Sequence, residues 1–267
     1  MSASAPSSSL PAYPETLGHP RPLWMLFMTE FWERFCFYGM RWMLTLYVVA
    51  QFFNGDPSGE ETANSTYGAY LALVYATSIL GGFAADRIIG YQRAVLMGAV
   101  VIAIGLFMLM LPSAFMFKVA LSVIVVGNGL FKPNISSMVG QLYAVGDNRR
   151  DRGFTIFYMG INAGAFFAPL ITGAVAQYFG YLDTSPAALK AEGFRAGFAC
   201  AGLGMLVSLL WFWFGRRQLK GVGAAPTPRS CRRPNQNQSR PTSMPRPAQT
   251  KPARKPVALS AAAFVGR

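Results

Sequence analysis

The stretch TEFWERFCFYGMRWML, residues 29–44, places four charged side chains inside a long run of aromatic and aliphatic residues. An α-helix turns by about 100° per residue, so the charged residues and one tyrosine share an arc of roughly 140°. These residues are Glu30, Glu33, Arg34, Tyr38 and Arg41. The rest of the helix surface is apolar. The stretch therefore predicts a helix with one polar stripe, on which Glu30 and Arg34 can form an ion pair across one turn.

The composition of the whole chain is typical of a membrane protein. Of the 267 residues, 52% are hydrophobic and only 13% are charged. In globular domains about a quarter of the residues are charged. Each of six hydrophobic blocks is long enough to cross a ~30 Å hydrocarbon core as a helix, the conformation that satisfies its own backbone. The blocks are residues 23–53, 64–85, 94–112, 115–143, 153–180 and 194–214. The predicted fold class is thus an all-α integral membrane protein with six transmembrane helices.

The connections between these blocks alternate in charge. One set is rich in Arg and Lys: DRIIGYQR (86–93), GDNRRDRG (146–153) and GRRQLK (215–220). The other set holds three basic residues and several acids: NGDPSGEETANST (54–66), PSAFMFK (112–118) and YLDTSPAALKAEGFR (181–195). The positive-inside rule places the first set and the N-terminus in the cytoplasm.

The two ends differ in composition from the predicted bundle, residues 23–220. Residues 1–22 and 221–267 are polar or proline-rich, cannot bury a core and are expected to be disordered. Half of the 24 Lys and Arg residues follow Gly215, where no acid occurs, so residues 216–267 carry +12 of the net charge of +13. A basic arm for nucleic acid or anionic lipid is disfavoured, because the tail lacks interleaved aromatic residues. Its abrupt onset is typical of a shifted reading frame in a GC-rich gene.

Several function classes are disfavoured by what the chain lacks. Its three cysteines are scattered and it has a single histidine, so we expect no disulfide framework, metal site or nucleophile–histidine pair. Ionisable groups inside a membrane cost about 2.5–3.5 kcal/mol each and usually face a water-filled pathway. A desolvated carboxyl beside an arginine is suited to binding and releasing a proton. The polar stripe favours such a pathway, and a structural ion pair between helices is the alternative.

The segment EFWERFCFYG, residues 30–39, resembles the E-x-x-E-R-F-x-x-Y-G motif of the proton-coupled oligopeptide transporters. This family, also called POT or PTR, is a branch of the major facilitator superfamily. The resemblance implies that Glu30, Glu33 and Arg34 take part in proton coupling. It also implies that Tyr38 and Arg41 line the peptide site, with Arg41 directed toward the peptide carboxylate.

A second segment, GNGLFKPNISSMVGQLY (127–143), resembles the family signature G-x-G-x-x-K-P-x-x-S. The resemblance implies that Lys132 faces the cavity and takes part in substrate or proton binding. Snorkelling toward the membrane surface is the alternative for a lysine. Pro133 is expected to break the helix at this point.

A third segment, FTIFYMGINAGAFFAPLITG (154–173), resembles the family stretch F-Y-x-x-I-N-x-G. Asn162 would then hydrogen-bond the peptide backbone, and a link between two helices is the alternative. Gly160 and Gly164 form the G-x-x-x-G pattern that lets helices approach closely. By resemblance, Tyr75 also lines the pocket.

The segment GGFAADRIIGYQR (81–93) is similar to the cytoplasmic loop motif of the superfamily. Gly90 permits a tight turn, and Asp86 can pair with or cap a neighbouring helix end in one conformation and release it in another. A plain charged loop is the alternative. The matching residues are Gly82, Asp86, Arg87, Gly90 and Arg93.

The resemblance covers residues 23–220, the N-terminal half of a fold built from two six-helix bundles. It implies a peptide:proton symporter for di- and tripeptides in the plasma membrane, here a bacterial inner membrane, with the proton as coupling ion and no other cofactor. The expected partners are small peptides, protons, the lipid bilayer and a second half or a second copy of the chain, and not nucleic acid. The chain is expected to be a truncated transporter that is inactive alone. The alternatives are a half-transporter subunit acting through dimerisation, or a carrier of another small solute.

Overall fold

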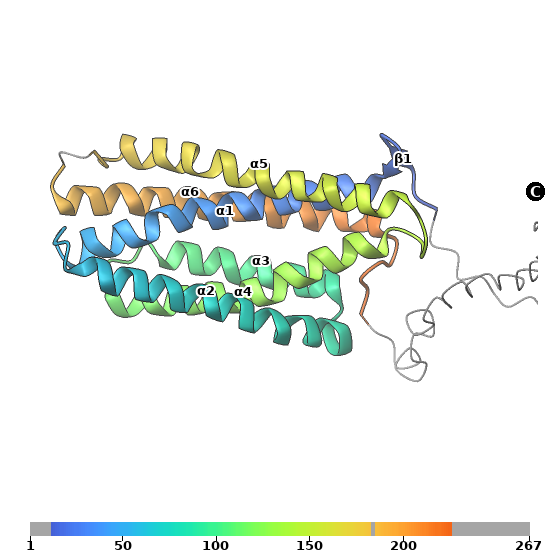
Figure 1. Ribbon diagram of the computed structural model, residues 1–267, viewed down its shortest axis with the longest axis horizontal. Coiled ribbons are helices and arrows are strands. Elements are labelled where there is room, and N and C mark those ends of the chain that lie inside the picture. The colour runs from blue at the N-terminus through green and yellow to red at the C-terminus, as the bar shows by residue number, and fades with distance from the viewer. Residues whose placement is uncertain (1–11, 183–184, 226–267) are drawn as a thin grey trace, which may run out of the picture. The chain divides into compact units, whose positions relative to one another are not determined.

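The computed structural model describes residues 12–182 and 185–225, and six long helices account for most of them (Figure 1). These are α1 (Arg21–Phe52), α2 (Gly59–Ala84), α3 (Tyr91–Met108), α4 (Ala114–Gln141), α5 (Arg149–Tyr178) and α6 (Ala187–Gly215). The short elements are β1 (Glu15–Thr16), β2 (His19–Pro20), the π-helical η1 (Ala85–Ile89) and the 3₁₀-helical η2 (Arg216–Leu219). The all-α prediction is confirmed for this part of the chain.

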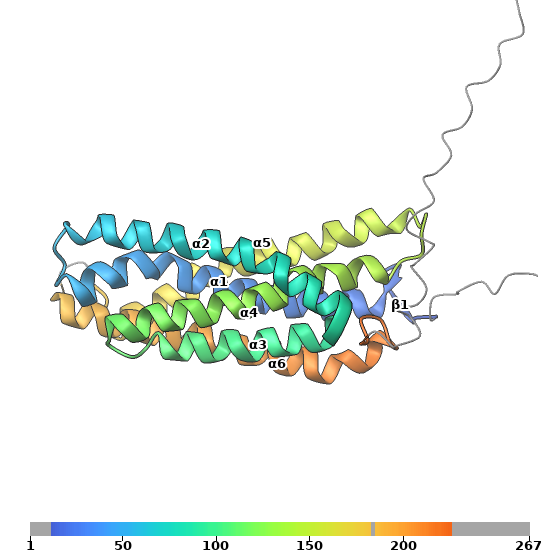
Figure 2. The same cartoon turned by 90° about the horizontal axis from the view of Figure 1, so that it is seen from below.

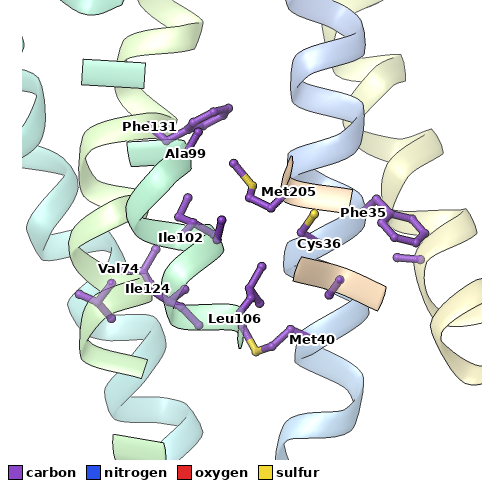
Figure 3. Packing of buried hydrophobic residues seen from close by; sticks show 14 of the residues in the cluster. Phe35, Cys36, Met40, Val74, Ala99, Ile102, Leu106, Ile124, Phe131 and Met205 are labelled. Carbon is purple, nitrogen blue, oxygen red and sulfur yellow. The ribbon is translucent and has the colours of Figure 1, made fainter. Parts of the chain in front are cut away.

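The helices form two groups of three. Helix α1 packs against α5 and α6, whereas α4 packs against α2 and α3, and contacts of α3 with α6 and of α1 with α2 join the groups (Figures 1 and 2). The seam between the groups is filled by apolar side chains. Figure 3 shows Met40 and Met205 pointing toward Ile102 and Leu106 across it. This core fixes where α1 presents its charged residues.

Five of the described helices are long and apolar enough to cross a membrane, judged by length and composition. They are α2 with η1, then α3, α4, α5, and α6 with η2. Helix α1 is long, with 32 residues, and carries Glu30, Glu33, Arg34 and Arg41, and it is not among the five. Five such helices indicate a multi-pass membrane protein.

The described helices all begin earlier than the predicted blocks, and the difference is largest in two of them. Helix α2 begins at Gly59 rather than at residue 64, and α6 begins at Ala187 rather than at 194. Hydrophobic patterning detects only the apolar part of a helix, whereas polar first turns extend it. In α2, Glu60 and Glu61 lie in the first turn, where carboxylates interact favourably with the positive end of the helix dipole.

The expectation that Pro133 breaks its helix is wrong, because α4 runs without interruption from Ala114 to Gln141. Proline removes one hydrogen bond and crowds the carbonyl one turn earlier, at Gly129. At Gly129 the backbone of α4 lies against α2, and an added Cβ atom would come within 2.8 Å of the Thr77 carbonyl oxygen. Packing against a neighbouring helix is how membrane helices tolerate proline.

The chain before α1 is ordered over its described part, unlike the disorder expected for residues 1–22. β1 and β2 pair antiparallel. His19 Nδ1 lies 2.8 Å from the Tyr143 hydroxyl, and Arg149 donates to Glu15 at 2.7 Å. Contacts distant in sequence thus order a segment that lacks a local signal. Residues 1–11 lie outside the described part.

After η2, the described residues of the predicted tail continue to residue 225. The backbone N–H of Gln92 donates to the Gly223 carbonyl at 2.9 Å, so this part of the chain is bound to the start of α3. The remainder of the predicted disordered tail, residues 226–267, lies outside the described residues. Its disorder and its origin in a shifted reading frame stay predictions.

Candidate functional site

Arg34 lies between two carboxylates in the interior of the bundle. Its Nε atom is 2.9 Å from Glu30 Oε1 and 2.5 Å from Glu33 Oε2. The exposed fractions are 2% for Glu30, 1% for Glu33 and 4% for Arg34. The ion pair predicted between Glu30 and Arg34 is therefore confirmed, and Glu33 joins it from the same helix.

This burial depends on a close approach of α5 to α1. A Cβ atom added at Gly164 would lie 3.0 Å from Arg34 Cβ and 3.1 Å from the Phe35 nitrogen, and one at Gly160 would lie 2.9 Å from the Phe27 ring. The two glycines let the backbones meet, as the G-x-x-x-G pattern predicts. The guanidinium carbon of Arg34 also lies 5.3 Å from the centre of the Phe37 ring.

Lys132 on α4 brings a second positive charge to this cluster. It interacts electrostatically with both Glu30 and Glu33. Among the described residues, Glu30 Oε2 and Arg34 Nη2 are buried without a hydrogen-bond partner, so the cluster has donor and acceptor capacity left for a rearranged pairing.

Tyr75 contacts Lys132, whose Nζ atom is 4.4 Å from the centre of its ring. This is the geometry of a cation–π contact. The Tyr75 side chain is 63% exposed and is not part of the cavity lining described next. The structure therefore places Tyr75 beside the charge cluster rather than in the predicted pocket.

Two turns along α1, a cavity of about 390 Å³ opens between α1, α2 and α5. Its lining residues are Tyr38, Arg41, Trp42, Thr45, Asn64, Tyr67, Ala165 and Pro169. The guanidinium carbon of Arg41 lies 5.8 Å from the Tyr38 ring centre and 5.3 Å from the Tyr67 ring centre. The cavity thus offers an exposed cation between two aromatic faces, an arrangement suited to a carboxylate-bearing ligand of small size.

Of the eight lining residues, only Tyr38 and Arg41 were predicted from the sequence, and three of the other six bring amide or aromatic groups to the cavity. Asn64 and Tyr67 lie three residues apart on α2 and so share one face of the helix. Trp42 is fixed by α5, because its indole N–H donates to the Thr172 hydroxyl at 2.8 Å. The sequence held a signal only for the α2 pair, which is an amide and a tyrosine at helical spacing at the start of the predicted helix 64–85.

Within the described part of the chain, Asn162 forms no hydrogen bond with the other predicted site residues. Its side chain is exposed on α5 and lies outside the cavity lining. Glu30, Glu33 and Arg34 form one local cluster, and Lys132 on α4 acts electrostatically on its carboxylates. The predicted site thus includes a buried charge cluster and an open cavity, and the contact of Asn162 with the peptide backbone stays a prediction.

The loop motif between α2 and α3 has the turn expected of it. Gly90 has φ = +79°, a conformation that favours glycine, and ends η1. Asp86, Arg87 and Arg93 are exposed. A Cβ atom added at Gly82 would lie 3.8 Å from the Pro133 side chain. The first turn of α3 has no side-chain cap, and capping by Asp86 in a second conformation stays a prediction.

A protein-family model described as the POT family matches residues 92–230. This chain belongs to the POT family. The matched range covers more than half of the chain and leaves out α1, so the assignment does not depend on the charged residues of that helix.

Similar proteins extend the match to most of this POT chain. The di-/tripeptide transporter of Lactococcus lactis subsp. lactis is 41% identical over 216 residues, which cover 79% of this chain and 41% of the relative. The peptide transporter YePEPT of Yersinia enterocolitica is 42% identical over 210 residues, covering 77% and 39%. The family and these relatives are transporters, not enzymes. The chain spans about two fifths of the length of the curated relatives it matches.

A solved structure agrees with the fold of this POT chain. The crystal structure of peptide transporter POT in complex with sulfate superposes with a TM-score of 0.71 at 40% sequence identity. The match covers 84% of this chain and 44% of that structure. The helical bundle described above is therefore a portion of a major facilitator fold.

Proposed function

We propose that this chain provides the proton-coupling cluster and one wall of the substrate site of a di-/tripeptide:proton symporter. The observation that carries the proposal is the position of both parts on one helix. Glu30, Glu33 and Arg34 form a buried ion cluster. Arg41 opens into a polar cavity seven residues later, a rise of about 10 Å along the helix.

Protonation of this cluster changes which groups pair. When Glu33 takes a proton, Arg34 keeps Glu30 as its charged partner and Lys132 loses one of the two carboxylates on which it acts. The site then carries one net positive charge more. A conformational equilibrium responds to any such difference in interaction energy between its states. This response is what coupling of proton and substrate movement requires.

Arg41 is the group that would bind the substrate carboxylate. It is exposed in the cavity, and a guanidinium pairs well with carboxylates. The rings of Tyr38 and Tyr67 flank it. The name of the Lactococcus relative supports di- and tripeptides as the substrate class.

A second candidate is another small solute that carries both an amino group and a carboxylate. A POT family transporter with 39% sequence identity to this chain has been solved in complex with 5-aminolevulinic acid. That compound shares the charged ends of a dipeptide. Arg41 would recognise the carboxylate in either case, and the two candidates differ in what fills the space between the charged ends.

The proposed membrane topology has six spans, with α1 as the span that composition alone does not identify. Its 32 residues are about 48 Å long, more than the ~30 Å of a hydrocarbon core. Glu30, Glu33 and Arg34 are buried inside the protein and do not face lipid. The basic loops support a cytoplasmic N-terminus. The plasma-membrane location is proposed because the relatives named above are peptide transporters of bacteria.

The remainder of the site would come from a second bundle. Substrates of such transporters bind between two repeats that rock against each other. A separately encoded second half or a second copy of this chain would complete the cavity. The mass of the detergent-solubilised protein distinguishes a stable dimer from a single chain.

The test is uptake of a labelled dipeptide by proteoliposomes that contain this chain, with and without an inward proton gradient. If a second copy of the chain completes the cavity, we expect gradient-driven uptake that Glu33→Gln abolishes and Arg41→Gln weakens by raising KM. If the chain is inactive alone, as the sequence predicts, the inserted protein should show no uptake until a second half is supplied. Arg152→Gln is the matched control, because Arg152 is exposed at the start of α5. Uptake that Glu33→Gln leaves unchanged would contradict proton coupling at this cluster. Uptake of 5-aminolevulinic acid but not of dipeptide would favour the second candidate.

A further inference from the structure

Two apolar grooves flank helix α6 near its C-terminal end. The first, between α1 and α6, has a volume of about 600 Å³. The second, between α3 and α6, has a volume of about 570 Å³. Leu210 and Phe214 line both grooves. These two side chains, 53% and 74% exposed, therefore form the ridge that separates one groove from the other.

Polar and cationic groups occur where the grooves reach the end of the bundle. Arg21 and Gln218 are the polar side chains lining the first groove. Arg216 lies over Trp213, a residue of the second groove, with 3.9 Å between the guanidinium carbon and the ring centre. A cationic side chain thus stands beside each groove at the same end of α6.

The first groove has the length of one membrane leaflet. Its lining on α6 and η2 extends from Val207 to Gln218, about 16 Å at the helical rise per residue. Half of a hydrocarbon core is about 15 Å. Trp24 and Trp211 also line this groove, and tryptophan is enriched at the level of lipid headgroups.

We propose that the two grooves bind the two acyl chains of one anionic phospholipid, with α6 between the chains and the headgroup at Arg21 and Arg216. The apolar walls suit acyl chains, and the cations suit a phosphate. The protruding ridge of Leu210 and Phe214 fits between two separate chains, whereas a partner helix docking on this face would have to cover both grooves and the ridge at once. The lipid site does not depend on the proposed transport activity.

The test uses the full chain, purified in detergent and incubated with phosphatidylglycerol or with phosphatidylcholine of the same acyl chains. Native mass spectrometry counts the lipids retained. We expect one phosphatidylglycerol per chain, retained about thirtyfold better than phosphatidylcholine, the factor expected for two cations near a headgroup. Arg21→Gln combined with Arg216→Gln should remove the preference, and Arg152→Gln should not.

The basic residues after Gly215 attract anionic lipid in any arrangement, so a second pair of variants leaves the charge unchanged. Val207→Trp and Met97→Trp each fill one groove, at side chains that are 40% and 50% exposed. Leu203→Trp is the matched control, because Leu203 is on the same helix and 59% exposed but lines neither groove. We expect the two groove-filling variants to lose retained lipid and the control to keep it.

Three results would overturn the proposal. They are equal retention of the two lipids, retention of phosphatidylglycerol that survives both groove-filling variants, and a dimer without lipid in which this face is covered by a second copy. If a variant does not fold, the lipid site is tested on the unaltered chain by thermal unfolding. Phosphatidylglycerol should then raise its Tm more than phosphatidylcholine or inorganic phosphate does, and an equal effect of all three argues against the site.

Discussion

Arg34 and Arg149 each form ion pairs with two carboxylates, but Arg34 is buried and Arg149 is partly exposed. Arg34 holds Glu30 and Glu33 with 5% of its side chain exposed. Arg149 holds Glu15 at 2.7 Å and Asp147 at 3.0 Å with 41% exposed. Water can replace the partners of Arg149. The partners of Arg34 can be replaced only by other groups of the protein, which makes the buried cluster sensitive to a single proton.

The largest expected effect comes from Arg34→Gln. It leaves two carboxylates buried without their arginine, and loss of one partner of a buried ion pair costs about 3–5 kcal/mol. We expect a large drop of Tm in detergent, measured by tryptophan fluorescence. Arg149→Gln is the matched substitution, and its drop should be much smaller, because exposed ion pairs contribute little. Equal drops would contradict the difference drawn between the two arginines.

The second largest effect is expected from a substitution that disturbs the packing around Arg34 without changing any charge. Gly164→Ala places a methyl group against the α1 backbone beside Arg34, and overpacking of this kind costs about 1–3 kcal/mol. Thermal unfolding should show a lower Tm. Gly68→Ala is the control, because nothing lies within 4 Å of an added Cβ atom there. Since alanine favours a helix over glycine, Gly68→Ala should leave the Tm unchanged or raise it.

The smallest effect concerns pH at the exposed cluster. Hydrogen bonds from Arg149 lower the pKa of the Asp147 carboxyl, so its contribution to stability is present above the usual aspartate value of about 4 and is lost as the pH falls through the lowered value. The Tm difference between the unaltered chain and Arg149→Gln should therefore shrink below that pH, and also in high salt. A difference that persists in both conditions would mean that Arg149 stabilises the fold through something other than these charges.

The sequence predicted those parts of the site that depend on one helix. The Glu30–Arg34 pair follows from a spacing of four residues, and the close approach at Gly164 follows from two glycines in register. Glu33 is adjacent to Arg34, and neighbouring residues do not face each other on a straight helix, so its ion pair could not be derived from spacing. It results from the confinement of both side chains between α1, α4 and α5.

Features that need two distant segments were not predictable. The contact of Arg41 with Tyr67 depends on how α2 crosses α1. The order of β1 and β2 depends on Tyr143 and Arg149, more than a hundred residues away. The continuity of α4 at Pro133 depends on its contact with α2. In each case the deciding interaction is a tertiary contact. The sequence contains the residues that make the contact but does not show which of them meet in the folded protein.

The two ends of the described bundle are bound to each other. The Tyr13 hydroxyl donates to the Leu219 carbonyl at 3.0 Å, and Lys220 Nζ donates to the Ala12 carbonyl at 2.6 Å. Adjacent ends of this kind make circular permutation feasible. A short linker from residue 225 to residue 12, with new ends opened between Asn54 and Ser58, would preserve every helix and change only their order along the chain.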